Sequence, residues 1–390
     1  MGLVGDLEAA EDAVQEACAA AVVQWRGGAI PANPGAWLVG AARHKALDWQ
    51  RREARRAHKE DAAMREYRGR RGPTEANPIA DDQLALIFLC CHPALDPGAR
   101  VALTLRAVCG LATAEIAAAF LLPEPTLAQR LVRAKRKIRE AAIPFGVPSA
   151  AALADRLSGV LRVVYLLFTQ GHRAPAGAEL VRPELCAEAI RLARELARLL
   201  PEEPEVIGLL ALLLLVDARR PGRVDDDGDL VLLEEQDRGR WDRAAVAEGA
   251  ALVEQALHAR RPGPYQIQAA IAACHSTAPT AAATDWEEIA ALYAELLRHE
   301  PTPVVEANRA VAVAMARGPA TGLAILDALA TDPRLVRWPP FHIARADLLS
   351  RLGRHSDAVG AYQTALALDP PAVERAFIAR CLRQVAPPGP

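Results

Sequence analysis

The chain has little of what builds sheets, membrane spans or disulfide-stapled folds. Aromatic residues make up 4% of its 390 residues, and strict alternation of apolar and polar residues is almost absent. The seven cysteines are odd in number and scattered, which argues against a disulfide framework and fits a reduced, cytoplasmic setting. No signal peptide or long uncharged apolar run is present. The very apolar stretch 209–216 is too short to cross a bilayer, so we expect a buried helix there and no membrane association.

Alanine, leucine and arginine dominate what is present. This composition, with few aromatic and β-branched residues, favours helices over strands. We therefore predict an all-α protein that is long enough for two or three domains. The formal net charge of -2 hides a division, because residues 1–142 sum to about +3 and residues 143–390 to about -5. A nearly neutral total therefore does not exclude a nucleic-acid partner.

The stretch 113–139 is the most informative part of the sequence. It predicts a short helix that Thr113 caps and that Pro123 ends, followed by a longer, strongly basic helix. The basic helix has an apolar stripe at helical spacing, formed by Leu127, Leu131, Ala134 and Ile138. Its other side carries a cationic row, formed by Arg130, Arg133 and Lys137 with Gln129 and Arg136 beside it. A helix-turn-helix presents this pattern to the DNA major groove, although a merely solvated basic helix has the same pattern.

The rest of the chain divides into four parts. Helices are predicted over 7–25 and 36–57, and residues 68–82 lack periodicity and carry Gly and Pro, as linkers do. Residues 83–142 hold three or four helices, one of them over 97–108 and capped by Asp96. Long Ala/Leu helices follow, with a tetratricopeptide-like pair at 341–370 and a degenerate neighbour at 308–333. Stacked helix pairs leave a concave surface that binds a peptide or a protein.

The first helix is amphipathic. We expect its apolar face at Ala10, Val14, Ala17 and Ala21. The opposite face is acidic and polar, with Glu11, Asp12, Gln15 and Glu16.

Two groups of residues resemble metal sites, but their spacing argues against metal binding. Cys90, Cys91 and His92 are adjacent and have no second Cys/His pair at zinc spacing, so we expect buried thiols. The aspartates of 225–229 resemble a calcium loop that lacks its closing glutamate, and we interpret 224–233 as a turn between two short extended segments. No phosphate loop, nucleophile elbow or catalytic triad is present. We predict no enzyme, no metal and no cofactor.

Residues 5–142 resemble a bacterial extracytoplasmic-function sigma factor, the promoter-recognition subunit of RNA polymerase. The matching segments are, in order, GDLEAAEDAVQEA, NPGAWLVGAARHKALDWQRRE and LATAEIAAAFLLPEPTLAQRLVRAKRKIR. The whole chain is similar to the subgroup with a long C-terminal helical extension, through VYLLFTQGH (164–172) and residues 212–242. The resemblance implies a region 2-like domain at 1–67, a linker at 68–82, a region 4-like helix-turn-helix domain at 83–142 and a helical domain at 143–390.

The resemblance also implies three binding surfaces. The acidic helix would dock on core RNA polymerase through Glu11, Asp12, Gln15 and Glu16. The second helix would contact the melted -10 promoter element, with Trp37 alternatively buried. Its residues for this role are Asn33, Trp37, Arg43, His44, Lys45, Asp48, Arg51 and Arg52. The helix-turn-helix would recognise the -35 element, with Gln129 and Arg130 on bases and the other cations on phosphates. Its residues are Glu124, Thr126, Gln129, Arg130, Arg133, Arg136 and Lys137.

We therefore expect a sigma factor that initiates transcription and is regulated by its extension. That extension would cover the DNA-binding domains or bind a regulatory protein or peptide. Two alternatives stay open: a helix-turn-helix regulator with a helical-repeat sensor, and an interaction scaffold that binds no DNA. Chains of the family usually carry another helix before GDLEAAEDAVQEA, whereas Met1 stands just before Gly5 here. Either the native start lies upstream or one helix is missing. A missing helix would leave apolar faces of 7–25 and 36–49 partly uncovered.

Overall fold

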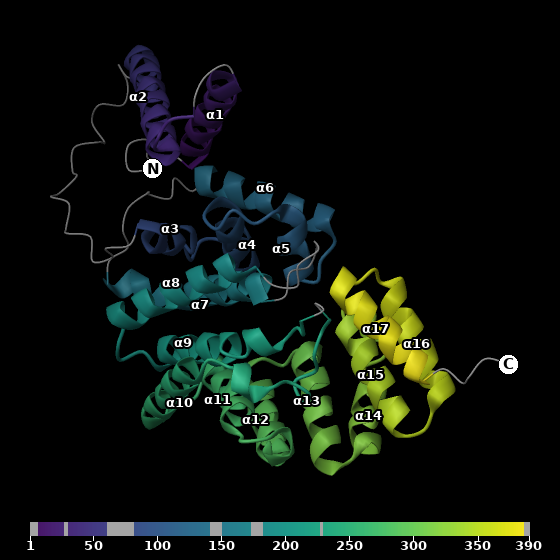
Figure 1. The fold of residues 1–390 in the computed structure, drawn as a ribbon. Helices are drawn as coiled ribbons and strands as arrows, with labels where there is room; N and C mark the ends of the chain where they lie inside the picture. Colours follow the sequence, from purple (N-terminus) through teal and green to yellow (C-terminus); the bar gives the residue numbers. More distant parts are fainter. Residues whose placement is uncertain are drawn as a thin grey trace. The chain divides into compact units, whose positions relative to one another are not determined.

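The computed structural model describes residues 7–26, 30–60, 82–140, 150–172, 182–226 and 229–385. Within these ranges the chain forms seventeen α-helices and three short 3-10 helices, η1 to η3 (Figure 1). One isolated antiparallel bridge joins Val224 and Leu230. The all-α prediction is confirmed. The chain divides into two compact units, a smaller unit of residues 1–80 with 137–149 and a larger unit of residues 81–136 with 150–390.

The smaller unit contains helices α1 (Leu7–Arg26) and α2 (Pro34–Glu60), which pack against each other. The buried side chains between them are small: Ala10, Ala13, Ala17, Ala21 and Ala46. Val14, which we expected in the apolar face, is 54% exposed, and Ala13 takes its place. Helical steps of three and four residues run from Ala10 to Ala17 through either Ala13 or Val14, so the spacing alone does not choose between them.

Apolar side chains also remain exposed on both helices of the smaller unit. Val22 and Val23 of α1 are 54% and 76% exposed, and Val39 of α2 is 70% exposed. Single apolar residues on a protein surface are ordinary. The expectation that a missing helix leaves these faces uncovered stays a prediction.

The larger unit begins with four helices: α3 (Asp82–Cys90), α4 (Pro97–Ala107), α5 (Thr113–Ala119) and α6 (Glu124–Glu140), which ends in the smaller unit. Asp96 caps α4 as predicted, because its carboxylate accepts a hydrogen bond from the Ala99 amide at 3.1 Å. The predicted cap of α5 is wrong: Ala112 stands at the N-cap position, and Thr113 is the first helical residue. The Glu115 carboxylate instead accepts a hydrogen bond from the Ala112 amide at 2.6 Å.

The remaining helices form the extension, residues 150–385, which is also part of the larger unit. They are α7 (Ala150–His172), α8 (Pro183–Leu199), α9 (Pro204–Asp217), α10 (Arg243–His258), α11 (Pro264–Thr277), α12 (Trp286–His299), α13 (Pro303–Arg317), α14 (Pro319–Ala328), α15 (Pro339–Arg351), α16 (His355–Ala367) and α17 (Ala372–Val385). The 3-10 helices are η1 (Arg220–Gly222), η2 (Arg238–Arg240) and η3 (Ala281–Ala283).

Helix α9 packs against α7, α8, α10 and α11 (Figure 1). All its residues from Val206 to Leu215 are buried, which confirms the predicted buried helix at 209–216. Gly208 allows the close approach of α11, since a Cβ atom at this position would lie 2.7 Å from the Gln266 backbone nitrogen. No helix of the described residues is long and apolar enough to span a membrane.

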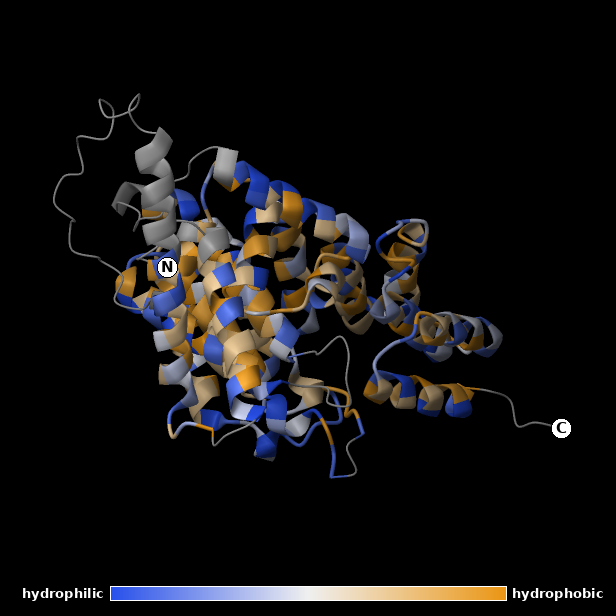
Figure 2. Cartoon of the chain, turned by 90° about the horizontal axis from the view of Figure 1, so that it is seen from above, coloured by the Kyte–Doolittle hydropathy of each residue, from blue (hydrophilic) through white to orange (hydrophobic). Residues whose placement is uncertain are grey.

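The C-terminal helices pack in pairs, as predicted. Helices α15 and α16 cover 341–370, and α13 and α14 cover most of 308–333. The first pair encloses buried residues at the spacings expected of a tetratricopeptide pair: Ala346, Leu349, Ala358, Tyr362 and Ala365. Gly353, with a φ of 72°, supplies the left-handed residue of the turn. Figure 2 shows apolar and polar residues side by side along most helices, as amphipathic packing requires.

The described residues of the two suspected metal motifs have structural roles. Cys90 and Cys91 are buried, and burial raises the pKa of the Cys91 thiol to about 12. Within the described ranges no group of three metal-ligating side chains lies close enough to hold an ion. The turn at 224–233 has one bridge pair, with residues 227–228 outside the description. The predicted linker also lies outside it, except for Asp82, which begins α3.

Candidate nucleic-acid interface

The turn between α5 and α6 sets the angle of the basic helix. The Leu122 amide donates to the Ala117 carbonyl at 2.9 Å and the Leu121 amide to the Ala118 carbonyl at 3.1 Å, the two hydrogen bonds of a Schellman motif. Leu121 occupies the left-handed position with a φ of 52°, which usually belongs to glycine. Pro123 follows and cannot continue the helix. The predicted break at 121–123 is therefore confirmed, with a strained leucine in the turn.

Helix α6 has one buried face and one exposed face. Leu127, Leu131 and Ala134 of the predicted stripe are buried, while Ile138 is half-buried. Most of the residues predicted to meet the -35 element are exposed: Glu124, Thr126, Gln129, Arg133, Arg136 and Lys137. The side chains of Gln129, Arg133 and Arg136 follow at steps of three and four residues, so they share one face of the helix.

Arg130 differs from its neighbours. It is half-buried, and its guanidinium lies over Gly98 in the first turn of α4, where a Cβ atom would be 2.6 Å from Nη1. Gly98 thus provides the space that Arg130 occupies. Its role as a base contact stays a prediction, and the structure adds a packing role between α6 and α4.

Sequence reasoning did not single out Val132. This side chain is 68% exposed and lies on α6 three residues after Gln129. Its position outside the stripe of Leu127, Leu131 and Ala134 was the signal that could have found it. An exposed valine among amide and guanidinium groups offers apolar contact to a thymine methyl group in the major groove.

The residues predicted for the -10 element lie on α2 and just before it. Arg43, His44, Lys45 and Asp48 are exposed, whereas the side chains of Arg51 and Arg52 lie outside the description. Asn33 is exposed and acts as the cap of α2, because its Oδ1 accepts a hydrogen bond from the Ala36 amide at 3.0 Å. Trp37 is half-buried, with its ring centroid 5.4 Å from that of Trp25 in an edge-to-face arrangement. Trp37 thus ties α2 to α1.

The acidic face of α1 is exposed at Asp12, Gln15 and Glu16, while the side chain of Glu11 is not described. Glu16 pairs with Lys45 of α2 at 3.0 Å. Both side chains are about half exposed, so such a pair stabilises the fold by less than about 1 kcal/mol. One member comes from the predicted polymerase surface and the other from the predicted DNA surface, a link that the sequence alone did not indicate.

Comparison with known proteins identifies these helices. The Sigma-70 region 2 family matches residues 1–56, and the Sigma-70, region 4 family matches residues 85–138. The chain belongs to the sigma-70 family. It is an extracytoplasmic-function-like sigma factor with a C-terminal extension. Residues 156–257 of the extension match a family of unknown function (DUF6596).

A similar full-length relative exists in Rhizobium meliloti (strain 1021), where the protein is described as uncharacterized. It is 43% identical over 386 residues, which cover 98% of this chain and 91% of the relative. The sigma-70 regions support a sigma-factor role, with core RNA polymerase and promoter DNA as the implied partners. They indicate a transcription factor rather than an enzyme.

The extension of this sigma-70 protein contacts the region 4 helices through side chains of α7 and α8. Arg156 of α7 is buried and donates from Nη1 to the Phe88 carbonyl of α3 at 3.0 Å, and burial lowers its pKa. Arg182, at the start of α8, pairs with Glu115 of α5 at 2.6 Å. Gly159 of α7 lies against Cys91, since a Cβ atom there would be 3.3 Å from Sγ. These contacts join region 4 and the extension into one unit.

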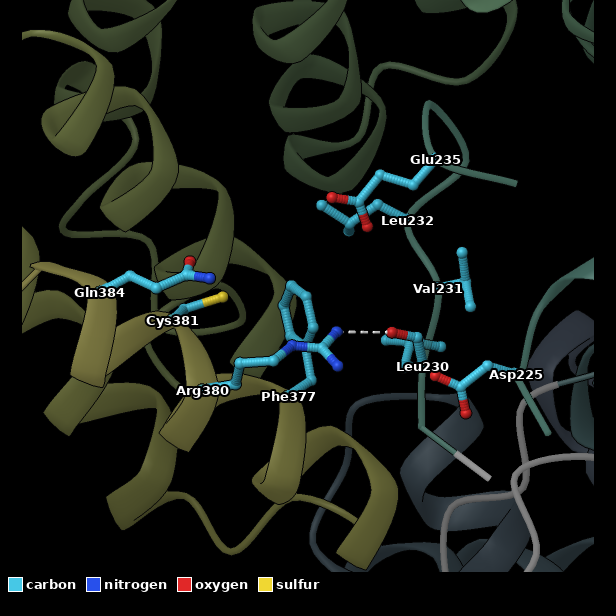
Figure 3. A pocket seen from close by; sticks show the side chains of 9 residues that line it. All are labelled: Asp225, Leu230, Val231, Leu232, Glu235, Phe377, Arg380, Cys381 and Gln384. Carbon is cyan, nitrogen blue, oxygen red and sulfur yellow. Dashed lines mark hydrogen bonds between the residues drawn. The ribbon is translucent and has the colours of Figure 1, made fainter. Parts of the chain in front are cut away.

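The extension also holds a small cavity of about 260 Å³ between the 225–235 segment and α17 (Figure 3). Its arginine, Arg380, already donates to the Leu230 carbonyl at 2.8 Å and pairs with Asp229 at 3.3 Å. The Arg380 guanidinium also lies 5.6 Å from the centre of the Phe377 ring. The volume is below that of most ligand pockets, and the cation is engaged within the protein. We assign no ligand to this cavity.

Proposed function

We propose that this sigma-70 protein binds core RNA polymerase, recognises the -10 and -35 promoter elements and initiates transcription under the control of its extension. The observation that carries the proposal is the two-sided helix α6. Its Leu127 and Leu131 are buried, while Arg133 and Lys137 are exposed on a helix that follows a tight helix-turn-helix connection. Such a helix can enter the major groove without losing its own packing.

For the -35 element, the exposed side chains of α6 divide into two chemical kinds. Gln129 carries an amide group that can form paired hydrogen bonds with a base edge, and Val132 offers an apolar contact. Arg133, Arg136 and Lys137 supply positive charge for phosphates, which holds the helix in the groove but carries no sequence information. Arg130, which packs over Gly98, would need to swing out to contact a base.

For the -10 element and the polymerase, the proposal uses the exposed faces of α2 and α1. Arg43, His44 and Lys45 supply cations and an imidazole toward melted strands. Asp12 and Glu16 supply carboxylates toward an arginine-bearing surface of the polymerase. Glu16 would have to exchange Lys45 for its polymerase partner. This exchange costs little free energy, because the Glu16–Lys45 pair is exposed. The exchange would also release Lys45 for a phosphate.

The proposed control by the extension depends on which helices of region 4 the extension contacts. Arg156 and Arg182 reach α3 and α5, whereas Gln129 and Arg133 of α6 remain exposed beside that contact. The extension therefore acts on the support of the recognition helix rather than by covering its DNA-binding face. A protein or peptide that binds the extension would change the orientation or stability of region 4 through α7 and α8.

The test is promoter-dependent transcription with purified core polymerase. The full chain and core polymerase are incubated with a pool of random DNA fragments, and transcripts from retained fragments are sequenced. We expect shared -35 and -10 sequences upstream of the start sites. An Asp12→Arg, Glu16→Arg variant should lose transcription. The matched control is Glu195→Arg on α8, because the Glu195 carboxylate pairs only with Arg198 in the described part of the chain.

Each rival function predicts a different result. A helix-turn-helix regulator that does not enter the polymerase would keep its DNA affinity and effect on transcription after charge reversal at Asp12 and Glu16. An interaction scaffold would retain no DNA fragments, with or without core polymerase. Transcripts that do not depend on the added chain would refute the proposal.

A further inference from the structure

The segment between α9 and α10, residues 218–242, is rich in arginine and lies outside the sigma-70 regions. Two ion pairs neutralise arginines of this segment within its described residues. Arg220 pairs with Asp217 at 3.2 Å, and Arg240 pairs with Asp226 at 3.6 Å. These pairs show the ordinary way in which the segment neutralises its cations.

Arg219 and Arg238 do not follow this arrangement. Arg238 donates from Nη1 to the carbonyls of His275 and Ala278, at 2.7 and 2.8 Å, and its guanidinium lies 4.5 Å from the centre of the Trp241 ring. For Arg219, no hydrogen bond or ion pair of its guanidinium occurs among the described residues. Carbonyls and rings orient a guanidinium but do not neutralise it.

Backbone and side-chain contacts bring the two arginines to one place. The Asp242 amide donates to the Ala218 carbonyl at 2.9 Å, next to Arg219 in the chain. A Cβ atom at Gly222 would lie 2.9 Å from Nε1 of Trp241, the residue on which Arg238 stacks. The turn that carries Arg219 therefore lies directly against the segment that carries Arg238. Arg223 is one turn further on and donates to the His172 carbonyl.

The electrostatics agree with this geometry. Burial first, then the charges of Arg223 and Arg238, lowers the pKa of Arg219 to about 10. Burial, together with Arg219 and Arg238, lowers the pKa of His275 to about 4, so its imidazole is neutral. The C-terminal end of α9 compensates only about half an elementary charge. Within the described part of the chain, Arg219 and Arg238 therefore lie close together with no carboxylate partner for either.

We propose that Arg219 and Arg238 form a binding site for the phosphate group of a small molecule. Planar guanidinium groups bind phosphate oxygens in pairs, and a phosphate group carries enough negative charge to offset two or more cations. The neutral His275 ring and the phenol of Tyr293, which lies near Arg219, can add hydrogen bonds. Arg219 is only half-buried, so a small anion can reach it.

The experiment measures binding to the full chain without polymerase, so it is independent of the sigma-factor proposal. Inorganic phosphate and AMP, a phosphate monoester, are titrated by calorimetry and by thermal unfolding at pH 7, with chloride at matched ionic strength as the reference. We expect saturable binding of phosphate or AMP and no response to chloride. Equal affinity for both would indicate recognition of the phosphate group alone, and tighter AMP binding would indicate contacts beyond it; both support the site.

Two variants make the test specific. Arg219→Gln and Arg238→Gln should each weaken phosphate binding at least tenfold, as expected for the loss of a charge-assisted hydrogen-bonding group. Arg240→Gln is the matched control, because Arg240 already pairs with Asp226. Arg219→Gln removes a half-buried cation without orphaning a partner in the described part of the chain, so it should fold. If Arg219→Gln does not fold, the Arg238→Gln variant and the comparison of phosphate with chloride on the wild-type chain still test the site. A phosphate response equal to that of chloride, or equal affinities for Arg238→Gln and Arg240→Gln, would overturn the proposal.

Discussion

Removal of two cations from the exposed face of α6 should change how promoter binding depends on salt. The variant is Arg133→Ala with Lys137→Ala, since both side chains are exposed and belong to the cationic row. Each phosphate contact contributes about 0.9 to the slope of log K against log salt. Between 50 and 200 mM salt one contact therefore changes affinity about 3.5-fold, and two contacts change it about 12-fold.

The assay is fluorescence anisotropy of a labelled promoter fragment with the reconstituted holoenzyme at several salt concentrations. The polymerase makes its own phosphate contacts, but these are common to both proteins, so the difference between the two slopes reports α6. We expect the slope of the double variant to be smaller by about 1.8. The control is Arg198→Ala with Arg298→Ala, which removes two exposed cations from α8 and α12.

An unchanged slope in the double variant would refute the assignment of α6 to DNA. An equal decrease in the control would also refute it, because the effect would then come from the net charge of the chain rather than from one helix face. A lower affinity with an unchanged slope would indicate a loss of shape complementarity instead of phosphate contacts.

Three further predictions concern the extension. Because burial, Arg219 and Arg238 hold the His275 pKa at about 4 rather than 6.5, the unfolded chain binds more protons, and stability present above pH 6.5 is lost as the pH falls toward 4. The loss between pH 7 and 5 should be about 2 kcal/mol by urea unfolding, and His275→Gln should flatten that dependence. Gly322→Ala should lower the free energy of unfolding by about 1–3 kcal/mol, since the new Cβ atom would lie 2.4 Å from the Ala310 carbonyl oxygen. Gly360→Ala should raise it by about 0.5–1 kcal/mol, because the space around Gly360 is open and alanine favours the helix. Changes of the same sign in both variants would contradict this prediction. Arg182→Ala should speed amide exchange in α5 by a few-fold, as the loss of about 0.5–1 kcal/mol requires, and unchanged exchange would count against the contact.

The sequence was sufficient for features that depend on periodicity and local chemistry. The stripe of Leu127, Leu131 and Ala134, the cap at Asp96 and the buried segment 209–216 all follow from spacing or from one side chain. The tetratricopeptide-like pair at 341–370 was equally readable, because Gly353 marks its turn. Local rules determine these elements, so one sequence is enough to find them.

Features that depend on long-range packing could not be predicted in the same way. In the sequence, Arg130 is one member of a basic row. Its packing position is visible only in the structure, where Gly98 of another helix lacks a side chain and leaves space for the guanidinium. Thr113 is a better capping residue than Ala112, yet Glu115 supplies the hydrogen bond and shifts the start of the helix. The pairs Glu16–Lys45 and Glu115–Arg182 join residues that sequence spacing does not relate.

Glu115 gives the start of α5 a dependence on a helix far away in the chain. One of its oxygens holds the Ala112 amide, and the other holds Arg182. Both hydrogen bonds depend on one side-chain rotamer, so a shift of α8 that moved Arg182 would also draw Glu115 away from the amide. Under the proposed control by the extension, such a shift would fray the first turn of the helix-turn-helix without a hinge or a large domain rotation.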